Sequence, residues 1–565
     1  MTELPPHFID KAMPLAKRSL PDLELDFPER SLVEGANVTR VGPSPTGMMH
    51  VGTLYVGLLN AMLADQSGGV SILRIEDTDG AREQDGATSF IIDSLARYKI
   101  QMDEGLRSSG ESIGEYGPYV QSARREIYQS CVKHLLNTGQ AYFCFCTPDE
   151  LEEQRDAQRR IGAPTGYYGS WARWRDQNVG ETAFALDSGR PFVIRFKSNG
   201  SQNRKRVAED LIFGTREVGQ SFQDIVILKQ DGLPTYHLAH VVDDHFMRTT
   251  HVLRGAEWLA SVPLHLQLFD AFGWTPPKYG HIAPIAKLDG GSRRKLSKRK
   301  DPEASVRYFE ELGYPPAAIL DYLMTLASPA FEDWRSLHPE LSVTQFPLSI
   351  DSMQNGAGPL FDFDKLDSIS RDVIASMEAE EVYEAVLEWA EQFDPNFGNL
   401  LSCDRDYTIG ILGIERSGSK RRKDITKWLD VKGDVRYFYD DLFELSESFA
   451  GLLTEAHPPN ELARIARDFY SILHVSDSQE VWFDRVKTLA TRYGYAARSK
   501  EYKANPSAYK GTVADFVKIF RVLLTGNPIS PDLYSVIQVM GFARVHTRLM
   551  RAEEIRTNGH HRPTF

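Results

Sequence analysis

The chain has 565 residues and a formal net charge of -13 at pH 7, with 42% hydrophobic and 25% charged residues. A chain of this length exceeds what one hydrophobic core can organise, so we expect about three to five domains. The composition is ordinary for a soluble globular protein and excludes wholesale disorder and collagen-like structure. The negative charge argues against a protein that coats nucleic acid through bulk positive charge, although local basic patches can still bind it.

Two features bear on the cellular compartment. No stretch approaches the roughly 18 consecutive apolar residues that a membrane span needs, and the N-terminus is too acidic and proline-broken for a signal peptide. The four cysteines, Cys131, Cys144, Cys146 and Cys403, are too few for a disulfide framework and suit a reducing compartment. The sequence therefore predicts a cytoplasmic protein that does not interact with a membrane.

In chain order, the first predicted part is a polar extension, residues 1–35. A short strand is predicted at 37–41, and a cluster of turn residues follows it at 42–47. Residues 51–64 predict a helix, because apolar side chains recur there every three or four positions and form one buried stripe. The β-rich run at 70–75 completes a strand, helix, strand unit, which normally builds a parallel sheet.

Further strands are predicted at 224–228 and 250–254, so we expect an insertion of about residues 136–215 to split the sheet. From about residue 302 onward the strand patterns thin out and helical periodicity dominates. The C-terminal part is therefore predicted to be mostly α-helical.

The first motif that carries chemistry, residues 40–53, leads from a strand end through a turn onto a helix N-terminus. Backbone N–H groups and the positive end of the helix dipole would face a nucleotide phosphate there. Gly52 would allow close approach, and His50 could donate to phosphate oxygens. A His-x-Gly string alone is more often a capped helix with an incidental histidine.

Two further motifs follow. Residues 74–79 place three carboxylates beyond the end of a predicted parallel strand, where ligands bind in open α/β sheets and where a carboxylate could hold a substrate ammonium. A helix cap is the alternative interpretation. In residues 295–300, Lys295 and Lys298 could close on a triphosphate and neutralise a pyrophosphate leaving group. The order and spacing of the three motifs carry more weight than any one of them.

Together, these motifs resemble those of class I aminoacyl-tRNA synthetases of the glutamyl type, from about residue 37 to 552. Residues 50–53 (His-Val-Gly-Thr) stand where that family has His-Ile-Gly-His, and residues 295–299 (Lys-Leu-Ser-Lys-Arg) where it has Lys-Met-Ser-Lys-Ser. Residues 74–79, 234–238 and 241–245 are typical of the glutamyl enzymes in particular. The string Leu-Leu-Thr-Gly at 523–526 resembles the family's anticodon-binding region.

The resemblance implies an α/β Rossmann-like catalytic domain that is split by an α+β insertion and followed by mostly α-helical tRNA-stem and anticodon-binding domains. The predicted parts are the polar N-terminal extension (1–35), the first half of the catalytic domain (36–135), the acceptor-end-binding insertion (136–215), the second half with the Lys-Leu-Ser-Lys-Arg loop (216–300), the helical stem-contact domain (301–365) and the helical anticodon-binding region (366–565).

The implied activity is that of a glutamate–tRNA ligase. L-glutamate would be activated with ATP and Mg²⁺ to glutamyl-adenylate and transferred to the 3′ end of tRNA(Glu), with release of AMP and diphosphate. The glutamate α-carboxylate itself attacks phosphorus, so catalysis would consist of positioning and electrostatic stabilisation. Monomers are usual in the family, and charging of tRNA(Gln) as well stays an open alternative.

The resemblance also implies site residues. The implied catalytic residues are His50, Lys295 and Lys298. The residues implied to bind glutamate or the adenylate are Arg40, Gly42, Ser44, Glu76, Tyr236, His240, Arg254 and Glu257. Those implied to bind ATP are His50, Gly52, Thr53 and Lys298. Because a dicarboxylate substrate needs two cationic partners, Arg40 and Arg254 can each bind one carboxylate, and Glu76 would bind the ammonium. We expect Arg40 and Tyr236 to lie nearer the side-chain carboxylate.

The sequence departs from the family pattern at two places. His240 stands where many members have Asn, which could alter the side-chain pocket or make it sensitive to pH. Some members bind zinc through Cys-x-Cys, a Tyr and a later Cys. Here Cys144 and Cys146 are present and Tyr168 could serve as the Tyr, but Ala172 takes the last place, so we expect no bound zinc.

Arg416, the basic run at 420–423 and Trp428 could contact tRNA, with phosphate bound by the basic groups and bases stacked on the indole, or could form a solvated loop. The alternatives to a glutamate enzyme are a glutamine-charging relative and a catalytically inactive tRNA-binding paralogue. The Arg40 clamp and the helical C-terminal region favour glutamate. The intact set of reactive residues disfavours an inactive paralogue.

Overall fold

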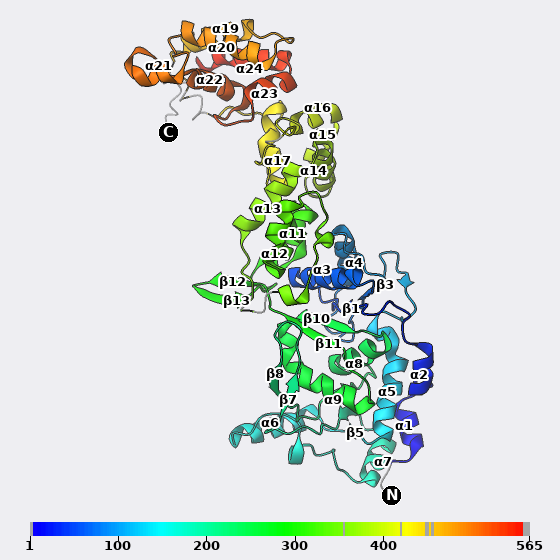
Figure 1. Cartoon of the computed structure of the whole chain (residues 1–565). Helices are drawn as coiled ribbons and strands as arrows, with labels where there is room; N and C mark the ends of the chain where they lie inside the picture. Colours follow the sequence, from blue (N-terminus) through cyan, green and yellow to red (C-terminus); the bar gives the residue numbers. More distant parts are fainter. Residues whose placement is uncertain are drawn as a thin grey trace. The chain divides into compact units, whose positions relative to one another are not determined.

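The computed structural model describes residues 4–556 except 354, 355, 357, 419, 420, 447–450, 452 and 454–456. The chain forms two compact units (Figure 1). Unit 1 consists of Met1–Glu310 and Ile319–Phe363, and unit 2 of Glu311–Ala318 and Asp364–Phe565. Throughout the described ranges, every helix is too short or too polar to cross a lipid bilayer.

Unit 1 contains the predicted strand, helix, strand unit. β1 (Val38–Val41) and β2 (Val70–Leu73) pair in parallel, and α3 (Val51–Gln66) connects them. After α3 the chain returns through Gly69, where a Cβ atom would lie 2.0 Å from the Asn37 carbonyl oxygen, so only glycine fits. This close approach starts β2 directly beside β1.

The sheet extends beyond β2, and a separate two-stranded parallel sheet lies beside β1. β3 (Glu104–Leu106) adds in parallel to β2, and β4 (Ser112–Ile113) adds antiparallel to β3. On the other side, the Thr250 N–H donates to the Val38 carbonyl at 2.9 Å and sets β10 (His251–Gly255) beside β1. β10 pairs in parallel with β11 (Lys278–Ile282). Strands from the two predicted halves of the catalytic domain therefore lie side by side.

The N-terminal residues differ from the predicted polar extension. They form α1 (Pro6–Ala12) and α2 (Leu20–Asp26), which lie against α5 (Arg125–Asn137), as the blue and cyan helices of Figure 1 show. Ile9 and Leu23 are buried in the core of unit 1. The helices are short and mostly polar on their outer faces, so the few core contacts were not apparent from composition.

The insertion has its own sheet, in which β6 (Val193–Phe196) lies between β5 (Ala141–Cys144) and β9 (Val226–Leu228), all antiparallel. The strand predicted at 224–228 therefore exists but pairs within the insertion and not in the parallel sheet. A separate hairpin joins β7 (Lys205–Ala208) to β8 (Arg216–Gly219). The helices of the insertion are α6 (Pro148–Arg160), η2 (Gly169–Trp171) and α7 (Val179–Asp187), whereas η1 (Gln121–Arg124) precedes α5.

The other elements up to Phe363 are mostly helical, apart from an antiparallel hairpin of β12 and β13. They are α4 (Ala87–Arg97), α8 (Tyr236–Phe246), η3 (Ala256–Ser261), α9 (Val262–Phe272), β12 (Ala286–Asp289), β13 (Ser292–Lys295), η4 (Pro302–Ala304), α10 (Val306–Leu312), α11 (Pro316–Ala327), α12 (Ala330–Leu337), η5 (Val343–Gln345) and η6 (Ile350–Ser352).

Among its described residues, unit 2 is helical apart from one isolated β-bridge between Ala496 and Thr512. Its helices are α13 (Phe363–Ser376), α14 (Ala379–Phe393), α15 (Pro395–Ser402), α16 (Arg405–Leu412), α17 (Trp428–Val435), η7 (Arg436–Phe438), α19 (Pro459–Ser471), α20 (Gln479–Arg492), α21 (Ser499–Ala504), η8 (Pro506–Ala508), α22 (Val513–Thr525), α23 (Leu533–Met540), α24 (Phe542–Met550) and η9 (Arg551–Arg556).

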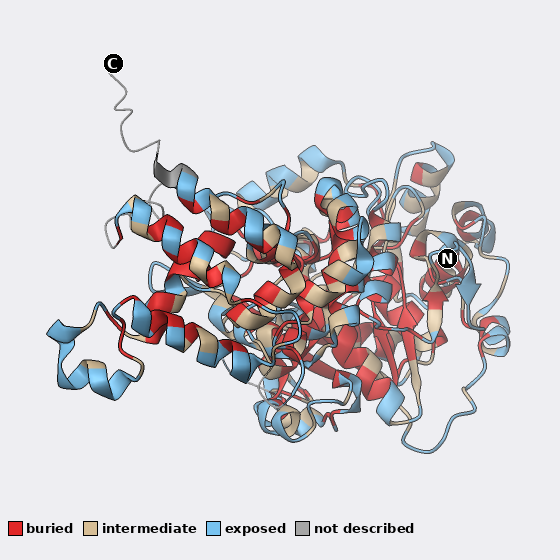
Figure 2. Cartoon of the chain, turned by 90° about the horizontal axis from the view of Figure 1, so that it is seen from above, coloured by how far each residue is buried: buried red, intermediate tan, exposed pale blue. Residues whose placement is uncertain are grey.

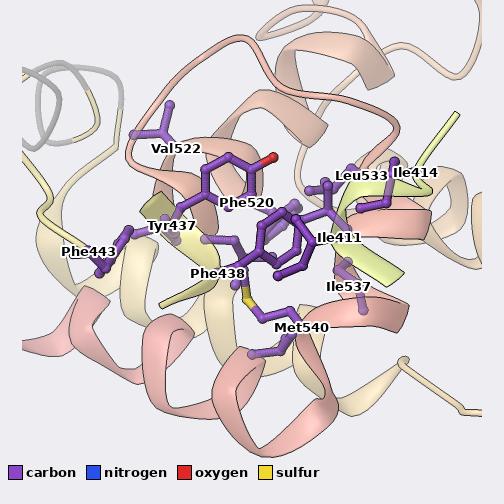
Figure 3. Close-up of a cluster of buried hydrophobic side chains, with 14 of the residues drawn as sticks. Ile411, Ile414, Tyr437, Phe438, Phe443, Phe520, Val522, Leu533, Ile537 and Met540 are labelled. Carbon is purple, nitrogen blue, oxygen red and sulfur yellow. The ribbon is translucent and has the colours of Figure 1, made fainter. Parts of the chain in front are cut away.

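A hydrophobic core joins most of these helices. Phe438 from η7, Phe520 from α22 and Met540 from α23 gather in it (Figure 3). Many of the helices in Figure 2 carry buried residues along one face and exposed residues along the opposite face, as amphipathic surface helices do. The expected class of fold, an α/β catalytic domain with an insertion and a helical C-terminal region, is confirmed.

Candidate active site

A cavity of about 700 Å³ opens at the carboxyl ends of β1, β2 and β10, where open α/β sheets bind ligands. Most of the predicted site residues line it. These are Arg40, Gly42, Ser44, His50, Gly52, Thr53, Glu76, Tyr236, Arg254, Glu257 and Lys295. His240 and Lys298 are not among the lining residues.

The N-terminus of α3 forms one end of the cavity. His50 is the N-cap of this helix, and its Nδ1 accepts a hydrogen bond from the Gly52 N–H at 2.8 Å. Burial and, after it, the positive charge of Lys298 lower the pKa of His50, while a hydrogen bond to the Leu296 backbone opposes them. His50 is therefore neutral near pH 7, with Nδ1 as acceptor and Nε2 as donor.

The lysine-containing segment follows the β12–β13 hairpin. The Lys295 ammonium lies 2.6 Å from Glu257 Oε1, and both side chains are about half exposed. Beyond Lys295, the Asp301 carboxylate accepts the Ser297 N–H at 2.9 Å and the Arg294 guanidinium at 2.8 Å. These bonds hold the segment in a fixed turn. Lys298 is exposed on it, close enough to lower the pKa of His50.

Arg40 and Glu76 lie together at the sheet end of the cavity. Burial raises the pKa of Glu76, and the charges of Arg74 and Arg40 oppose this rise. The Arg74 guanidinium donates to Glu76 Oε1 at 3.0 Å and to Asp244 Oδ1 at 2.6 Å. A Cβ atom at position 42 would lie 2.3 Å from Glu76 Oε1, so Gly42 leaves room for this carboxylate.

Arg254 reaches the cavity from β10 and is held from several sides. Its Nε donates to His281 Nε2 at 3.1 Å, and its NH1 donates to the Tyr236 hydroxyl at 3.2 Å. The opposite nitrogen of His281, Nδ1, bonds to the buried Asp210 carboxylate, so His281 donates from Nδ1 and accepts at Nε2. The ring of Tyr236 packs against that of Trp258 with centroids 4.2 Å apart. The guanidinium therefore has a fixed orientation.

His240 lies outside the lining of the cavity. It is fully buried on α8, with Nδ1 3.2 Å from Arg40 NH2 and Nε2 3.0 Å from the Tyr279 hydroxyl. Burial, followed by the charges of Arg254 and Arg40, lowers the pKa of His240 well below its ordinary value. This direction favours a neutral His240 at physiological pH, and the effect of His240 on the side-chain pocket stays a prediction.

The buried partners of the site were not predicted from the sequence. Three of them, Arg74, Asp243 and Asp244, belong to segments that resemble the family, but those segments alone predicted no structural role for these side chains. Asp243 accepts hydrogen bonds from the Arg124 Nε at 2.7 Å and from the Tyr128 hydroxyl at 2.8 Å. His281, Tyr279 and Asp210 had no motif that could have found them. They become partners only because β11 lies beside β10.

The two cysteines of the insertion share one hydroxyl group. Cys144 Sγ and Cys146 Sγ each lie 3.5 Å from the hydroxyl of Tyr167 and not from that of Tyr168, which donates to the Pro164 carbonyl. Ala172 is buried in the same small cluster. In the part of the chain that the structure describes, no group of three or more His, Cys, Asp or Glu residues could hold a metal ion.

The basic residues proposed for tRNA contact in the C-terminal region are mostly engaged within unit 2. Arg416 is 2% exposed and donates to the Leu412 carbonyl at 3.0 Å, and Trp428 is 4% exposed in the core. Arg421 donates to the Ser376 carbonyl at 2.7 Å. Lys420 lies outside the described residues. Arg416 and Trp428 are therefore core residues and not a tRNA surface.

Comparison with known proteins identifies the family. The model of the class I tRNA synthetase (E and Q) catalytic domain matches residues 37–359. The glutamate–tRNA ligase of Acetivibrio thermocellus is 45% identical over 525 residues, which cover 93% of this chain and 95% of the relative. That of Sorangium cellulosum is 41% identical over 94% of this chain and 97% of its own.

A solved structure agrees with these relatives. The crystal structure of a glutamate tRNA ligase from Elizabethkingia meningosepticum in complex with its amino acid has a TM-score of 0.74 and 26% identity, and the match covers 92% of this chain and 99% of that one. The identity to the two relatives extends over nearly the whole chain, including the helical region beyond the catalytic model. The chain therefore belongs to the glutamate–tRNA ligase family of class I aminoacyl-tRNA synthetases.

Proposed function

We propose that this protein activates L-glutamate with ATP to glutamyl-adenylate and transfers the glutamyl group to the 3′ end of tRNA(Glu). The observation that carries the proposal is the pair of buried arginines, Arg40 and Arg254, at one cavity with the carboxylate of Glu76. Two guanidinium groups match the two carboxylates of glutamate, and Glu76 matches its ammonium. Both arginines are held by hydrogen bonds before a substrate arrives, which reduces the entropic cost of binding.

The phosphates of ATP would bind at the N-terminus of α3. There, backbone N–H groups and the helix dipole face an anion, and His50, Gly52 and Thr53 line the same end of the cavity. Lys295 and Lys298 would neutralise the phosphates. Mg²⁺ would enter with ATP and be bound mainly by phosphate oxygens, since such ions usually keep several waters.

The reaction then proceeds in two displacements. An oxygen of the glutamate α-carboxylate attacks the α-phosphorus, the bond to the bridging oxygen breaks, and pyrophosphate leaves. A terminal ribose hydroxyl of the tRNA next attacks the carbonyl carbon of the adenylate, and AMP leaves. His50, Lys295 and Lys298 would stabilise the charge that develops on the phosphate oxygens of the first step.

The tRNA contacts belong to the same proposal. The insertion, with β5, β6 and β9, would bind the acceptor end, and the helices of unit 2 would bind the stem and the anticodon. The division of the chain into six parts, the monomeric state and the cytoplasmic location remain predictions.

The experiment is acylation of unfractionated tRNA with labelled glutamate and, separately, labelled glutamine, in the presence of ATP and Mg²⁺. We expect charging with glutamate, a loss of roughly 100- to 1,000-fold in the rate for Lys298→Ala, and near-normal charging for Lys300→Ala, an exposed lysine of the same segment. Charging with glutamine alone would overturn the assignment of glutamate as the amino-acid substrate. Absence of any charging, with tRNA still bound, would favour an inactive paralogue.

A further inference from the structure

Arg40 uses only part of its guanidinium to hold itself in the protein. Its Nε donates to Asp244 Oδ1 at 3.2 Å, and its NH2 lies 3.2 Å from His240 Nδ1. Nε and NH2 form the lateral edge of the planar group. NH1 and the second hydrogen of NH2 form the terminal edge, which can still donate two parallel hydrogen bonds to a carboxylate.

The two residues that hold the lateral edge lie four positions apart on α8. His240 and Asp244 therefore project from the same face of the helix, one turn apart. Together they form a fork that matches the lateral edge of Arg40. Because Arg40 lines the cavity and both partners are fully buried, the terminal edge is the part of the guanidinium that remains for a ligand.

The fork requires one tautomer of His240. The NH2 group of Arg40 can only donate hydrogen bonds, so Nδ1 of His240 must accept, and the ring proton of the neutral His240 must be on Nε2. Nε2 lies 3.0 Å from the Tyr279 hydroxyl, which can accept that proton in a hydrogen bond. Asp244 Oδ2 lies 3.1 Å from Nδ1 of His240, but the two atoms lack hydrogen-bond geometry. Among the described residues, this oxygen has no hydrogen-bond partner. The geometry thus favours the Nε2–H form.

We propose that His240 is a positioning residue that directs the terminal edge of Arg40 at the side-chain carboxylate of glutamate, and that Tyr279 fixes the tautomer it needs. The inference rests on the proposed function and deepens it. His240 itself does not touch the substrate. His240 affects the selectivity for glutamate over glutamine, because a correctly directed guanidinium edge binds both oxygens of a carboxylate. The amide of glutamine offers only one oxygen, and its NH2 group, itself a donor, would face the N–H donors of Arg40.

The test compares three replacements of one side chain. The Oδ1 of Asn lies near the position of Nδ1 and can accept from Arg40. The polar end of Gln lies near Nε2 and reaches Tyr279 instead. Ala offers neither group. Each variant is assayed for tRNA acylation as the full chain, with KM for glutamate, KM for ATP and kcat measured separately and with thermal unfolding recorded. His134→Asn, on α5 and away from the cavity lining, is the control.

We expect His240→Ala and His240→Gln to raise KM for glutamate by about 10- to 100-fold, the equivalent of one hydrogen bond to a charged group. KM for ATP should stay within about threefold, as expected if uniform binding of one substrate is lost. His240→Asn should restore KM for glutamate to within about threefold of wild type. The preference for glutamate over glutamine should fall by at least tenfold in the Ala and Gln variants and recover in the Asn variant.

Two outcomes would overturn the proposal. One is an Asn variant as impaired in KM for glutamate as the Ala variant, which would indicate a packing role. The other is an equal rise in KM for ATP. If His240→Ala does not fold, the comparison of Asn with Gln still decides. Tyr279→Phe is a second test and should raise KM for glutamate by about three- to tenfold. An unchanged KM would show that Tyr279 does not fix the tautomer of His240. Failure of the wild type to charge glutamate would instead refute the proposed function.

Discussion

The ammonium of Lys295 lies 2.6 Å from the carboxylate of Glu257 at the edge of the cavity. An ion pair this exposed contributes only about 0.2–1 kcal/mol to stability. If Lys295 instead serves the reaction, Lys295→Ala should lower kcat by roughly 100- to 1,000-fold with an unchanged unfolding midpoint. Steady-state acylation and a thermal melt measure the two effects. Equal losses of kcat in Lys295→Ala and Lys300→Ala would show that only the overall positive charge of the segment matters, and not a specific role of Lys295.

His50 combines a structural and a chemical role that substitution can separate. His50→Ala removes the N-cap of α3 and should cost about 1 kcal/mol of stability as well as two to three orders of magnitude in rate. Asn is a good N-cap residue, so His50→Asn should keep the stability but not the rate. Chemical denaturation and acylation assays test this pair. Recovery of activity by Asn would mean that the cap, and not the Nε2 donor, is what catalysis needs.

The buried carboxylate of Asp243 should be important for the stability of unit 1. It accepts hydrogen bonds from Arg124 and Tyr128, and Asp243→Asn would leave the buried guanidinium without its counter-charge. We expect a loss of about 3 kcal/mol in the free energy of unfolding. Asp270→Asn, which breaks the exposed pair with Arg206, should cost less than about 1 kcal/mol. Urea unfolding compares the two, and similar costs would contradict this view.

Asp434 should destabilise unit 2 at neutral pH. Burial, and then the charge of Asp424, raise the pKa of Asp434 from 3.8 to about 6. The folded state therefore holds a proton that the unfolded state has lost between these values, and stability falls as pH rises through this window. Asp434→Asn should raise the unfolding midpoint at pH 7.5, and the gain should shrink as pH falls from 6 towards 4. A gain that is independent of pH would refute this assignment, and Asp441→Asn, at an exposed residue of the same unit, is the control.

Local sequence patterns predicted the parts of the fold that are encoded locally. The apolar spacing in residues 51–64 located α3, and the turn that follows β1 led directly to the N-terminus with His50. The order of the three motifs, compared with a known family, predicted most of the residues that line the cavity. These predictions needed only the periodicity of one element or the chemistry of one string.

The errors arose where the outcome depends on residues that are distant in sequence. The strand at Val226–Leu228 looks the same whichever sheet it joins, and only its pairing with β6 assigns it to the insertion. Arg416 resembled a surface residue of a basic run but donates to backbone carbonyls inside unit 2. Tyr167, and not Tyr168, faces the cysteines because adjacent side chains of an extended segment point to opposite sides.

We propose that one preorganised cavity recognises glutamate joined to AMP. The most direct measurement is calorimetric binding of two non-hydrolysable sulfamoyl adenylate analogues, one with a glutamyl and one with a glutaminyl side chain. Mimics of reaction intermediates bind far more tightly than substrates. We predict nanomolar binding of the glutamyl compound and at least 100-fold weaker binding of the glutaminyl compound, with the difference abolished in Arg40→Ala. Equal affinity for the two compounds, or a preference for the glutaminyl one, would show that the cavity does not recognise the side-chain carboxylate of glutamate.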